Sequence, residues 1–137
     1  MVNECTLHFE TEPPIQFTVA DGTGIEKGAI LKLTDPMTAS LADGDADLIA
    51  GIAAEEKIAN DGRTKLAVYR RGIFRGFAGT GGVTVGLAIN VDASTSDSNE
   101  IVNAAAGHDK QLGVSFETAT SGESFLFELN PTHRDEA

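Results

Sequence analysis

Residues 125–129 read Phe-Leu-Phe-Glu-Leu, and their alternation is the starting point for predicting the fold class. Phe125, Phe127 and Leu129 alternate with Leu126 and Glu128. A period of two residues places one set of side chains on the buried face of a β-strand and the other set on the opposite face. The stretch therefore predicts a β-strand near the end of the chain with one face in the core.

Similar apolar stretches recur along the chain. Glycine-containing pairs such as Asp21-Gly22 and Asp61-Gly62 separate them and are typical of tight turns. Only Ala54–Ala59 (AEEKIA) has a helical pattern, about two turns long. The spacing predicts an all-β fold, a compact small barrel or β-sandwich of short strands with at most one short helix. The other expected strands are 15–19, 29–33, 48–53, 65–70, 72–77, 83–91 and 114–116.

One order of motifs occurs twice. Gly24–Ile30 (GIEKGAI) aligns with Gly82–Ala88 (GVTVGLA) 58 residues later, and Ile49–Ala53 aligns with Gln111–Ser115 62 residues later. Each copy runs as a strand, a wide loop, a strand carrying a glycine, a short linker and a last strand. This order predicts an internal pseudo-duplication around one core, with chance recurrence of glycine-punctuated strands as the alternative.

A chain of 137 residues suits a single domain. We expect one β domain over residues 15–130, with an extended N-terminal arm over residues 1–14 and a flexible tail over residues 131–137. The acidic stretch 35–47 and the polar stretch 92–99 are expected to be loops outside the core.

The expected arm has the features of an extended segment. Pro13 and Pro14 force an extended exit and do not fit in the middle of a sheet. Leu7 and Phe9 alternate with polar residues, so the arm can pair as an edge strand. Such a strand can add to the sheet of a partner, with backbone hydrogen bonds supplying affinity and these two side chains acting as anchors.

The composition argues against several classes of partner. Acidic residues outnumber basic ones by 21 to 10, which gives a formal net charge of −11. Surfaces that bind nucleic acid or anionic lipid are positively charged, so we expect no direct contact with nucleic acid and none with a membrane. The single cysteine, Cys5, excludes an internal disulfide and a zinc site built from thiolates.

No motif predicts an enzyme, a cofactor or a strong metal site. Gly113–Glu117 (GVSFE) ends in Glu where a serine nucleophile elbow has Gly. Asp43–Asp47 spaces three carboxylates as a calcium loop begins, but Leu48 and Ala54 stand where an EF-hand has Gly and Glu. A looser cation site and a solvated acidic loop remain as alternatives for this segment.

Basic residues are concentrated in one stretch. If 65–70 and 72–77 were neighbouring strands, their cations would line one strip of an otherwise acidic molecule. Such a strip suits an acidic partner surface or a second copy of the chain. The alternative is ordinary solvated charge that discourages edge-to-edge aggregation. Half of the ten basic residues lie in this stretch: Arg63, Lys65, Arg70, Arg71 and Arg75.

Five segments occur in a recognisable order: GIEKGAILKL, DADLIAGIAAEEK, DGRTKLAVYRRGIFRGFAG, GGVTVGLAINVDA and HDKQLGVSFETATSGESFLFELN. Structural glycines and apolar residues hold fixed places in them: Gly28, Gly51, Ile52, Ala53, Gly62, Val68, Gly72, Gly86, Gly113 and Leu129. This order resembles the head-decoration, or capsid cement, proteins of tailed bacteriophages. The resemblance covers about residues 15–130 and departs from the family at the acidic stretch 35–47 and at Glu55–Ala59.

The resemblance implies a non-catalytic, mostly β protein of the virion. It implies that the chain is made in the host cytoplasm and binds the outer capsid surface, commonly as a homotrimer at or near three-fold positions. The implied partner is the major capsid protein, whose adjacent subunits the chain would clamp against internal DNA pressure. The candidate shell or subunit contacts are Leu7, Phe9, Pro13, Pro14, Arg70, Arg71 and Arg75.

Two further hypotheses stay open at this point. One is a non-catalytic glycan- or calcium-binding β module of a phage fibre or surface protein, carried by the stretches 35–47 and 92–99. The other is a small enzyme such as a hydrolase, which would need His108 near Ser115 or a pair of aspartates in one concavity.

Overall fold

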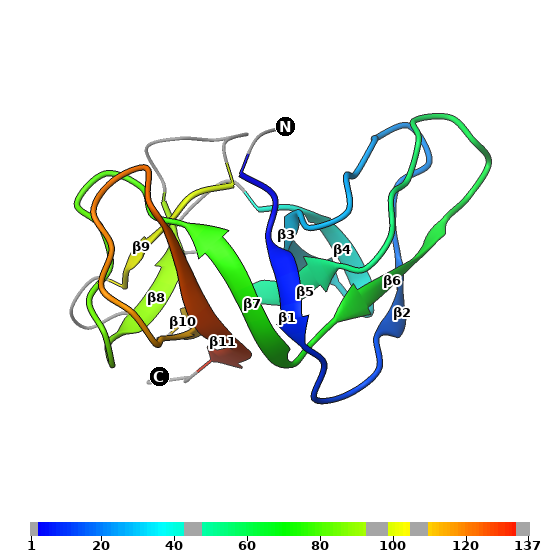
Figure 1. Cartoon of the computed structure of the whole chain (residues 1–137). Helices are drawn as coiled ribbons and strands as arrows, with labels where there is room; N and C mark the ends of the chain where they lie inside the picture. The colour runs from blue at the N-terminus through cyan, green and yellow to red at the C-terminus, as the bar shows by residue number, and fades with distance from the viewer. Residues whose placement is uncertain (1–2, 43–47, 93–98, 105–109, 134–137) are drawn as a thin grey trace.

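The computed structural model describes residues 3–42, 48–92, 99–104 and 110–133. This part of the chain consists of strands and turns, without a helix (Figure 1). It therefore contains no helix that is long and apolar enough to cross a membrane. The strands are β1 (Thr6–Phe9), β2 (Ile15–Thr18), β3 (Ile30–Asp35), β4 (Thr38–Leu41), β5 (Ile49–Ala53), β6 (Lys65–Tyr69), β7 (Gly72–Phe77), β8 (Ala88–Val91), β9 (Ile101–Asn103), β10 (Lys110–Ser115) and β11 (Ser124–His133).

The first half of the chain forms a closed barrel in the order β2-β4-β3-β5-β6. Its ladders are antiparallel, except that Thr18 of β2 pairs in parallel with Thr38 of β4 and closes the ring. Phe17, Leu31 and Leu66 are among the side chains buried inside it. A closed ring leaves no strand edge of the barrel unpaired.

Six strands form a second sheet in the order β1-β7-β11-β10-β8-β9 (left in Figure 1). A parallel bridge between Ala78 and Ile101 joins the end of β7 to β9, so this sheet also curls toward closure. Phe125, Phe127 and Leu129 are fully buried and Glu128 is exposed, which confirms the alternation predicted for this stretch.

One hydrophobic cluster extends from the sheet to the barrel, and the interior of the barrel holds a second cluster of its own. Ile49 and Ile52 of the barrel belong to the same buried cluster as Phe74 and Phe127 of the sheet. The rings of Phe74 and Phe127 stack with their centroids 6.2 Å apart. The two halves therefore pack as one body, as the sequence predicted for a compact β fold.

The two halves repeat the same backbone hydrogen bonds. Ile25 and Lys57 exchange a pair of bonds of 2.9 and 2.7 Å, and Val83 and Ala119, 58 and 62 residues further on, exchange a pair of 2.9 and 3.1 Å. The strand pairs follow the same scheme, since β3 lies between β4 and β5 as β8 lies between β9 and β10. This repetition is the internal pseudo-duplication that the sequence predicted.

Glycines mark equivalent turns in the two halves. Gly28 and Gly86 have φ angles of +92° and +81°, and Gly62 and Gly122 have φ angles of +87° and +88°. Side chains other than glycine rarely adopt these angles, so the paired glycines in the sequence reflect a backbone requirement at each turn.

Two of the secondary-structure predictions are wrong. Ala54–Ala59 is not a helix, because Lys57 within it bridges to Ile25 as an extended residue and is buried. The expected strand 83–91 is reduced to β8, because Gly86 turns the chain and leaves Val85 and Leu87 exposed.

Parts of the stretches that were expected to lie outside the core are ordered in strands or buried. Residues 35–47 contain β4, and residues 43–47 lie outside the described part. Asn99 is buried and accepts a hydrogen bond from the Ile30 amide at 2.8 Å, while residues 93–98 lie outside the described part. In the N-terminal segment Cys5 lies in the core, and at the other end β11 continues to His133.

Candidate interaction surface

β1 is an exposed edge strand of the six-stranded sheet, as predicted for the N-terminal segment. One side of β1 pairs with β7, and within the described residues no other strand pairs with its second side. Thr6, His8 and Phe9 are exposed along it. An exposed edge offers backbone donors and acceptors to another strand, so β1 can accept a strand from a partner.

A β-bulge in β1 decides where its two apolar side chains point. Leu7 pairs with the buried Phe74, but Phe9 pairs with Ile73, because the register shifts between Leu7 and Phe9. The extra residue sends Phe9 to the opposite face of the sheet from Leu7. Leu7 accordingly packs against the core, while Phe9 is 61% exposed. Of the two anchors predicted from sequence, Phe9 is the more exposed and Leu7 is half-buried.

Two connections cross between the sheet and the barrel at the same corner. Residues 10–14 lead from β1 to β2, with Pro13 exposed and Pro14 half-buried, and Arg70 and Arg71 join β6 to β7. Arg70 is half-buried and donates to the carbonyl oxygens of residues 49 and 50 at 3.2 and 2.9 Å. Arg70 is therefore part of the corner's structure, and Arg71 is its exposed cation.

Electrostatics link the two connections. Burial lowers the pKa of Arg70, the positive charge of Arg71 lowers it further, and the carboxylate of Glu12 acts in the opposite direction. Glu12 in the first connection thus lies close enough to act on Arg70 in the second. The segment predicted as an arm and two of the predicted cations meet at this corner.

The cationic strip that would require 65–70 and 72–77 to be neighbouring strands is not formed. β6 belongs to the barrel and β7 to the sheet, so these strands are not neighbours. Arg63 pairs with Glu55, and Lys65 Nζ donates to the Thr18 hydroxyl at 2.9 Å. Arg75 donates to the Ser124 hydroxyl at 3.2 Å, with the Glu117 carboxylate 3.9 Å away. These cations are spread over both halves and engage local partners.

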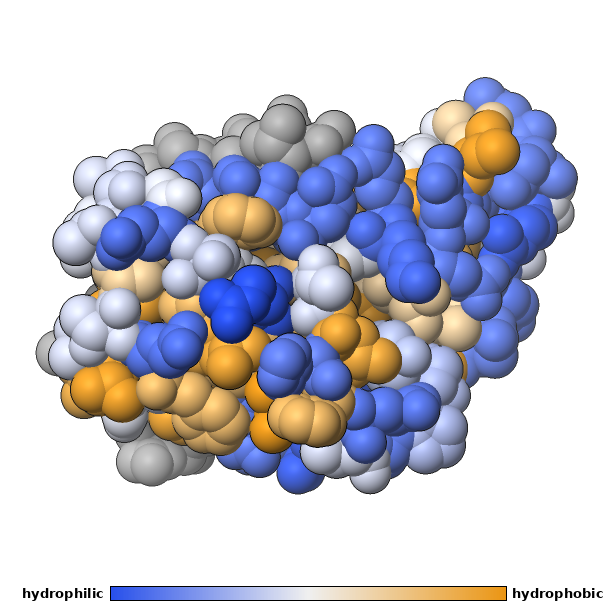
Figure 2. All heavy atoms as spheres, in the orientation of Figure 1, coloured by the Kyte–Doolittle hydropathy of each residue, from blue (hydrophilic) through white to orange (hydrophobic). Residues whose placement is uncertain are grey.

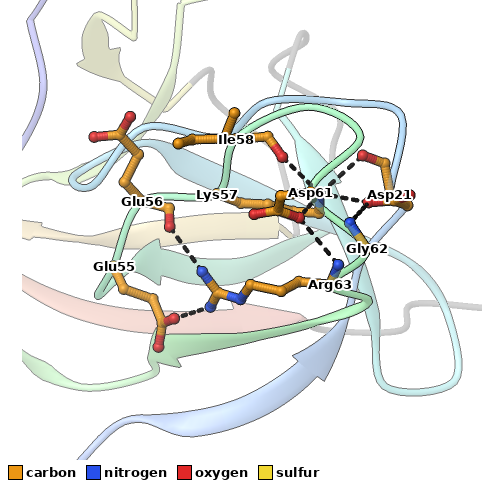
Figure 3. A network of polar contacts seen from close by, with 8 residues as sticks. All are labelled: Asp21, Glu55, Glu56, Lys57, Ile58, Asp61, Gly62 and Arg63. Carbon is orange, nitrogen blue, oxygen red and sulfur yellow. Dashed lines mark hydrogen bonds and ion pairs between the residues drawn. The ribbon is translucent and has the colours of Figure 1, made fainter.

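A buried lysine organises the projecting loops of the barrel (Figure 3). Lys57 is 1% exposed, and its ammonium donates to the carbonyl oxygens of Asp21 and Ile58 at 2.8 and 3.1 Å. It also pairs with the carboxylates of Asp61 and Asp21 at 3.0 and 3.2 Å. The sequence analysis did not identify this buried, charge-paired lysine. The one sequence signal for its burial is that Lys57 occupies the place of Ala119, which is buried in the other half.

The charge state of Lys57 is determined by its hydrogen-bond and ion-pair partners. Burial alone would lower the pKa of Lys57, but the hydrogen bonds and charges of Asp61 and Asp21 outweigh burial and raise the pKa. The amide of Arg63 and the ammonium of Lys57 lower the pKa of Asp61. A lysine held protonated is a structural cation and does not act as a nucleophile.

The described residues place no catalytic or metal-binding cluster together. They contain no group of three or more His, Cys, Asp or Glu side chains that could hold a metal ion. Burial raises the pKa of the Cys5 thiol to about 12, so the thiol stays neutral. Ser115 is buried in β10 and its hydroxyl donates to the carbonyl oxygen of Glu117 at 2.5 Å. Asp43–Asp47 and His108 lie outside the described residues, so the hypotheses that involve them stay untested.

Comparison with known proteins gives a family match and a structural match. A family model described as phage cement protein matches residues 9–129. Among solved structures, the crystal structure of the head fiber gp8.5 N base in bacteriophage phi29 is similar, with a TM-score of 0.57 and 14% sequence identity, over 89% of this chain and 98% of that chain. At this identity the structural match concerns the fold. No curated protein matches the chain.

Proposed function

Since the chain belongs to the phage cement protein family, we propose that it binds the outer surface of the phage capsid and stabilises the shell by clamping adjacent major capsid subunits. The observation that carries this proposal is the family match over residues 9–129, which implies a capsid-associated structural role in the virion. A structural role of this kind needs surfaces for contact and no reaction centre.

The exposed edge of β1 supports this proposal. A strand of the capsid subunit adds to β1 through backbone hydrogen bonds, and Phe9 fills an apolar recess beside it. Arg71 and the adjoining segment 10–14 lie at the end of the same edge. This surface, defined by β1, residues 10–14 and Arg71, is the proposed shell contact.

The double architecture of the chain fits a clamp. Two similar halves are joined by one hydrophobic cluster but carry different loops, so they present different surfaces to two neighbouring subunits. Association as a homotrimer on the shell would multiply these contacts, and linked weak contacts give high avidity without a single strong site. We therefore include in this proposal that the chain forms a homotrimer and that its partner is the major capsid protein.

The proposal is tested by co-sedimentation of the full chain with purified capsids, together with mass measurement of the free protein. We expect saturable binding to expanded capsids and much weaker binding to unexpanded ones, because only the expanded lattice presents the correct subunit spacing. Arg71→Glu is expected to weaken binding in a manner that depends on salt. A chain that stays in the supernatant with expanded capsids overturns the proposal.

A further inference from the structure

The two halves of the pseudo-duplication differ at one projecting tip. Ala54 and Ala67 are joined by a 2.9 Å backbone hydrogen bond, as are Phe116 and Leu126 in the other half. The chain between the first pair is three residues longer than between the second. In Figure 1 this longer loop, in green, projects at the upper right beside the blue segment that follows β2. The tip comprises residues 20–26 and 55–63.

The tip is held rigid by internal charge pairs. The Lys57 ammonium ties both segments together through Asp21 and Asp61, and the Gly62 amide donates to the Asp21 carboxylate at 2.8 Å. Arg63 adds a second tie through Glu55 and the carbonyl oxygen of Glu56 at 3.1 Å. A loop ordered before binding loses less conformational entropy when a partner arrives.

This rigid tip presents an apolar side chain to solvent. Ile58 is 65% exposed, which is more than any other large hydrophobic residue in the described part of the chain. Figure 2 shows an orange group on the projecting tip, surrounded by hydrophilic side chains. An exposed isoleucine beside a fully buried, charged lysine is the reverse of the ordinary placement of these residues, and folding alone does not require the isoleucine to be there.

A groove of about 500 Å³ lies beside this side chain. Ile25, Leu41 and Ile58 supply its apolar lining, and Glu26 and Glu56 supply its acidic lining. Lys57 also lines the groove, but its side chain is fully buried and its ammonium is engaged by Asp21 and Asp61. Figure 3 shows the Glu56 carboxylate pointing away from the network of Lys57 and Arg63. The groove therefore combines an apolar surface with an acidic border.

We propose that this groove is a second contact with the shell and receives an apolar side chain flanked by Lys or Arg on a capsid subunit. The inference rests on the proposed function and adds a partner chemistry to it. Charge complementarity favours such a partner, because the chain carries a net charge of −11 and the groove is bordered by the acidic residues Glu26 and Glu56. A contact at the tip and another at β1 would engage two different subunits.

The test compares variants of the full chain in titrations of expanded capsids. Ile58→Asp and Glu56→Lys are each expected to weaken binding by about tenfold or more, and Glu56→Lys also to reduce the salt dependence of binding. Val85→Asp is the matched control, since Val85 is an exposed apolar residue (55%) of the other half. Thermal unfolding of each variant checks that the fold is intact.

The outcomes separate this inference from the proposed function. If the unmodified chain binds and both tip variants bind equally well, the tip inference is wrong and the proposed function stands. If Val85→Asp weakens binding as much as Ile58→Asp, the loss reflects added charge and the inference is likewise overturned. If the unmodified chain does not bind, the proposed function fails and this inference fails with it.

Discussion

Replacement of Phe9 by Ser tests the proposed shell contact most sharply. Phe9 is 61% exposed. A phenylalanine offers about 200 Å² of surface, so about 120 Å² is available to a partner. Burial of that area at about 25 cal/mol per Å² contributes about 3 kcal/mol to binding. Phe9→Ser is therefore expected to weaken each capsid contact by about two orders of magnitude.

The stability of the folded chain should change much less. The covered part of Phe9 amounts to about 80 Å², so its loss costs at most about 2 kcal/mol of unfolding free energy. Urea unfolding measures this cost, and titration of expanded capsids measures binding. Met37→Ser is a matched control, because Met37 is 51% exposed on the β3–β4 turn of the barrel. If Phe9→Ser binds within twofold of the unmodified chain while folded, the role given to β1 is refuted.

The core and the titrating groups give further expected outcomes. Phe127→Ala should lower the unfolding free energy by about 3–5 kcal/mol in urea, because the side chain is fully buried; a loss below about 1 kcal/mol would contradict the shared core. Gly51→Ala should also destabilise the fold, by more than about 1 kcal/mol, because φ is +152° and a Cβ would collide with the Tyr69 carbonyl oxygen; unchanged stability would contradict this geometry. The folded pKa of Asp61 lies below its ordinary 3.8, so the unfolded chain binds the proton first as the pH falls, and the stability contributed above pH 3.8 is lost in acid. Asp61→Asn should flatten that part of the pH profile of unfolding, and an unaltered profile would contradict the assignment. Cys5 should react with a thiol reagent only as fast as the chain opens, because the thiol is buried and its pKa is raised to about 12; immediate labelling of the native chain would contradict its burial.

Alternation of apolar and polar residues predicted correctly those strands that keep one face in the core along their whole length. Phe125, Phe127 and Leu129 face one core along their whole length, so a period of two was sufficient. The stretch 83–91 has the same alternation but contains Gly86 at a positive φ angle, and the pattern of apolar residues does not record that turn. Comparison of the two repeats does reveal the turn at Gly86, because the equivalent Gly28 also has a positive φ angle.

Features that depend on distant residues were not predictable from local pattern. Ala54–Ala59 has helix-forming residues, but Lys57 is held extended and buried by Asp21, 36 positions earlier. The hypothesis of a cationic strip over 63–75 required neighbouring strands, and the chain instead passes from barrel to sheet between Arg70 and Arg71. The bulge that exposes Phe9 depends on its register with β7, which the sequence of β1 alone does not set.

The most direct test of a capsid clamp is a cryo-electron microscopy reconstruction of expanded capsids saturated with this chain. The account predicts ordered density on the outer surface at each occupied lattice position, with the β1 edge against one capsid subunit and the tip around Ile58 against its neighbour. Density that contacts a single subunit only, or lies on the inner surface of the shell, would contradict it.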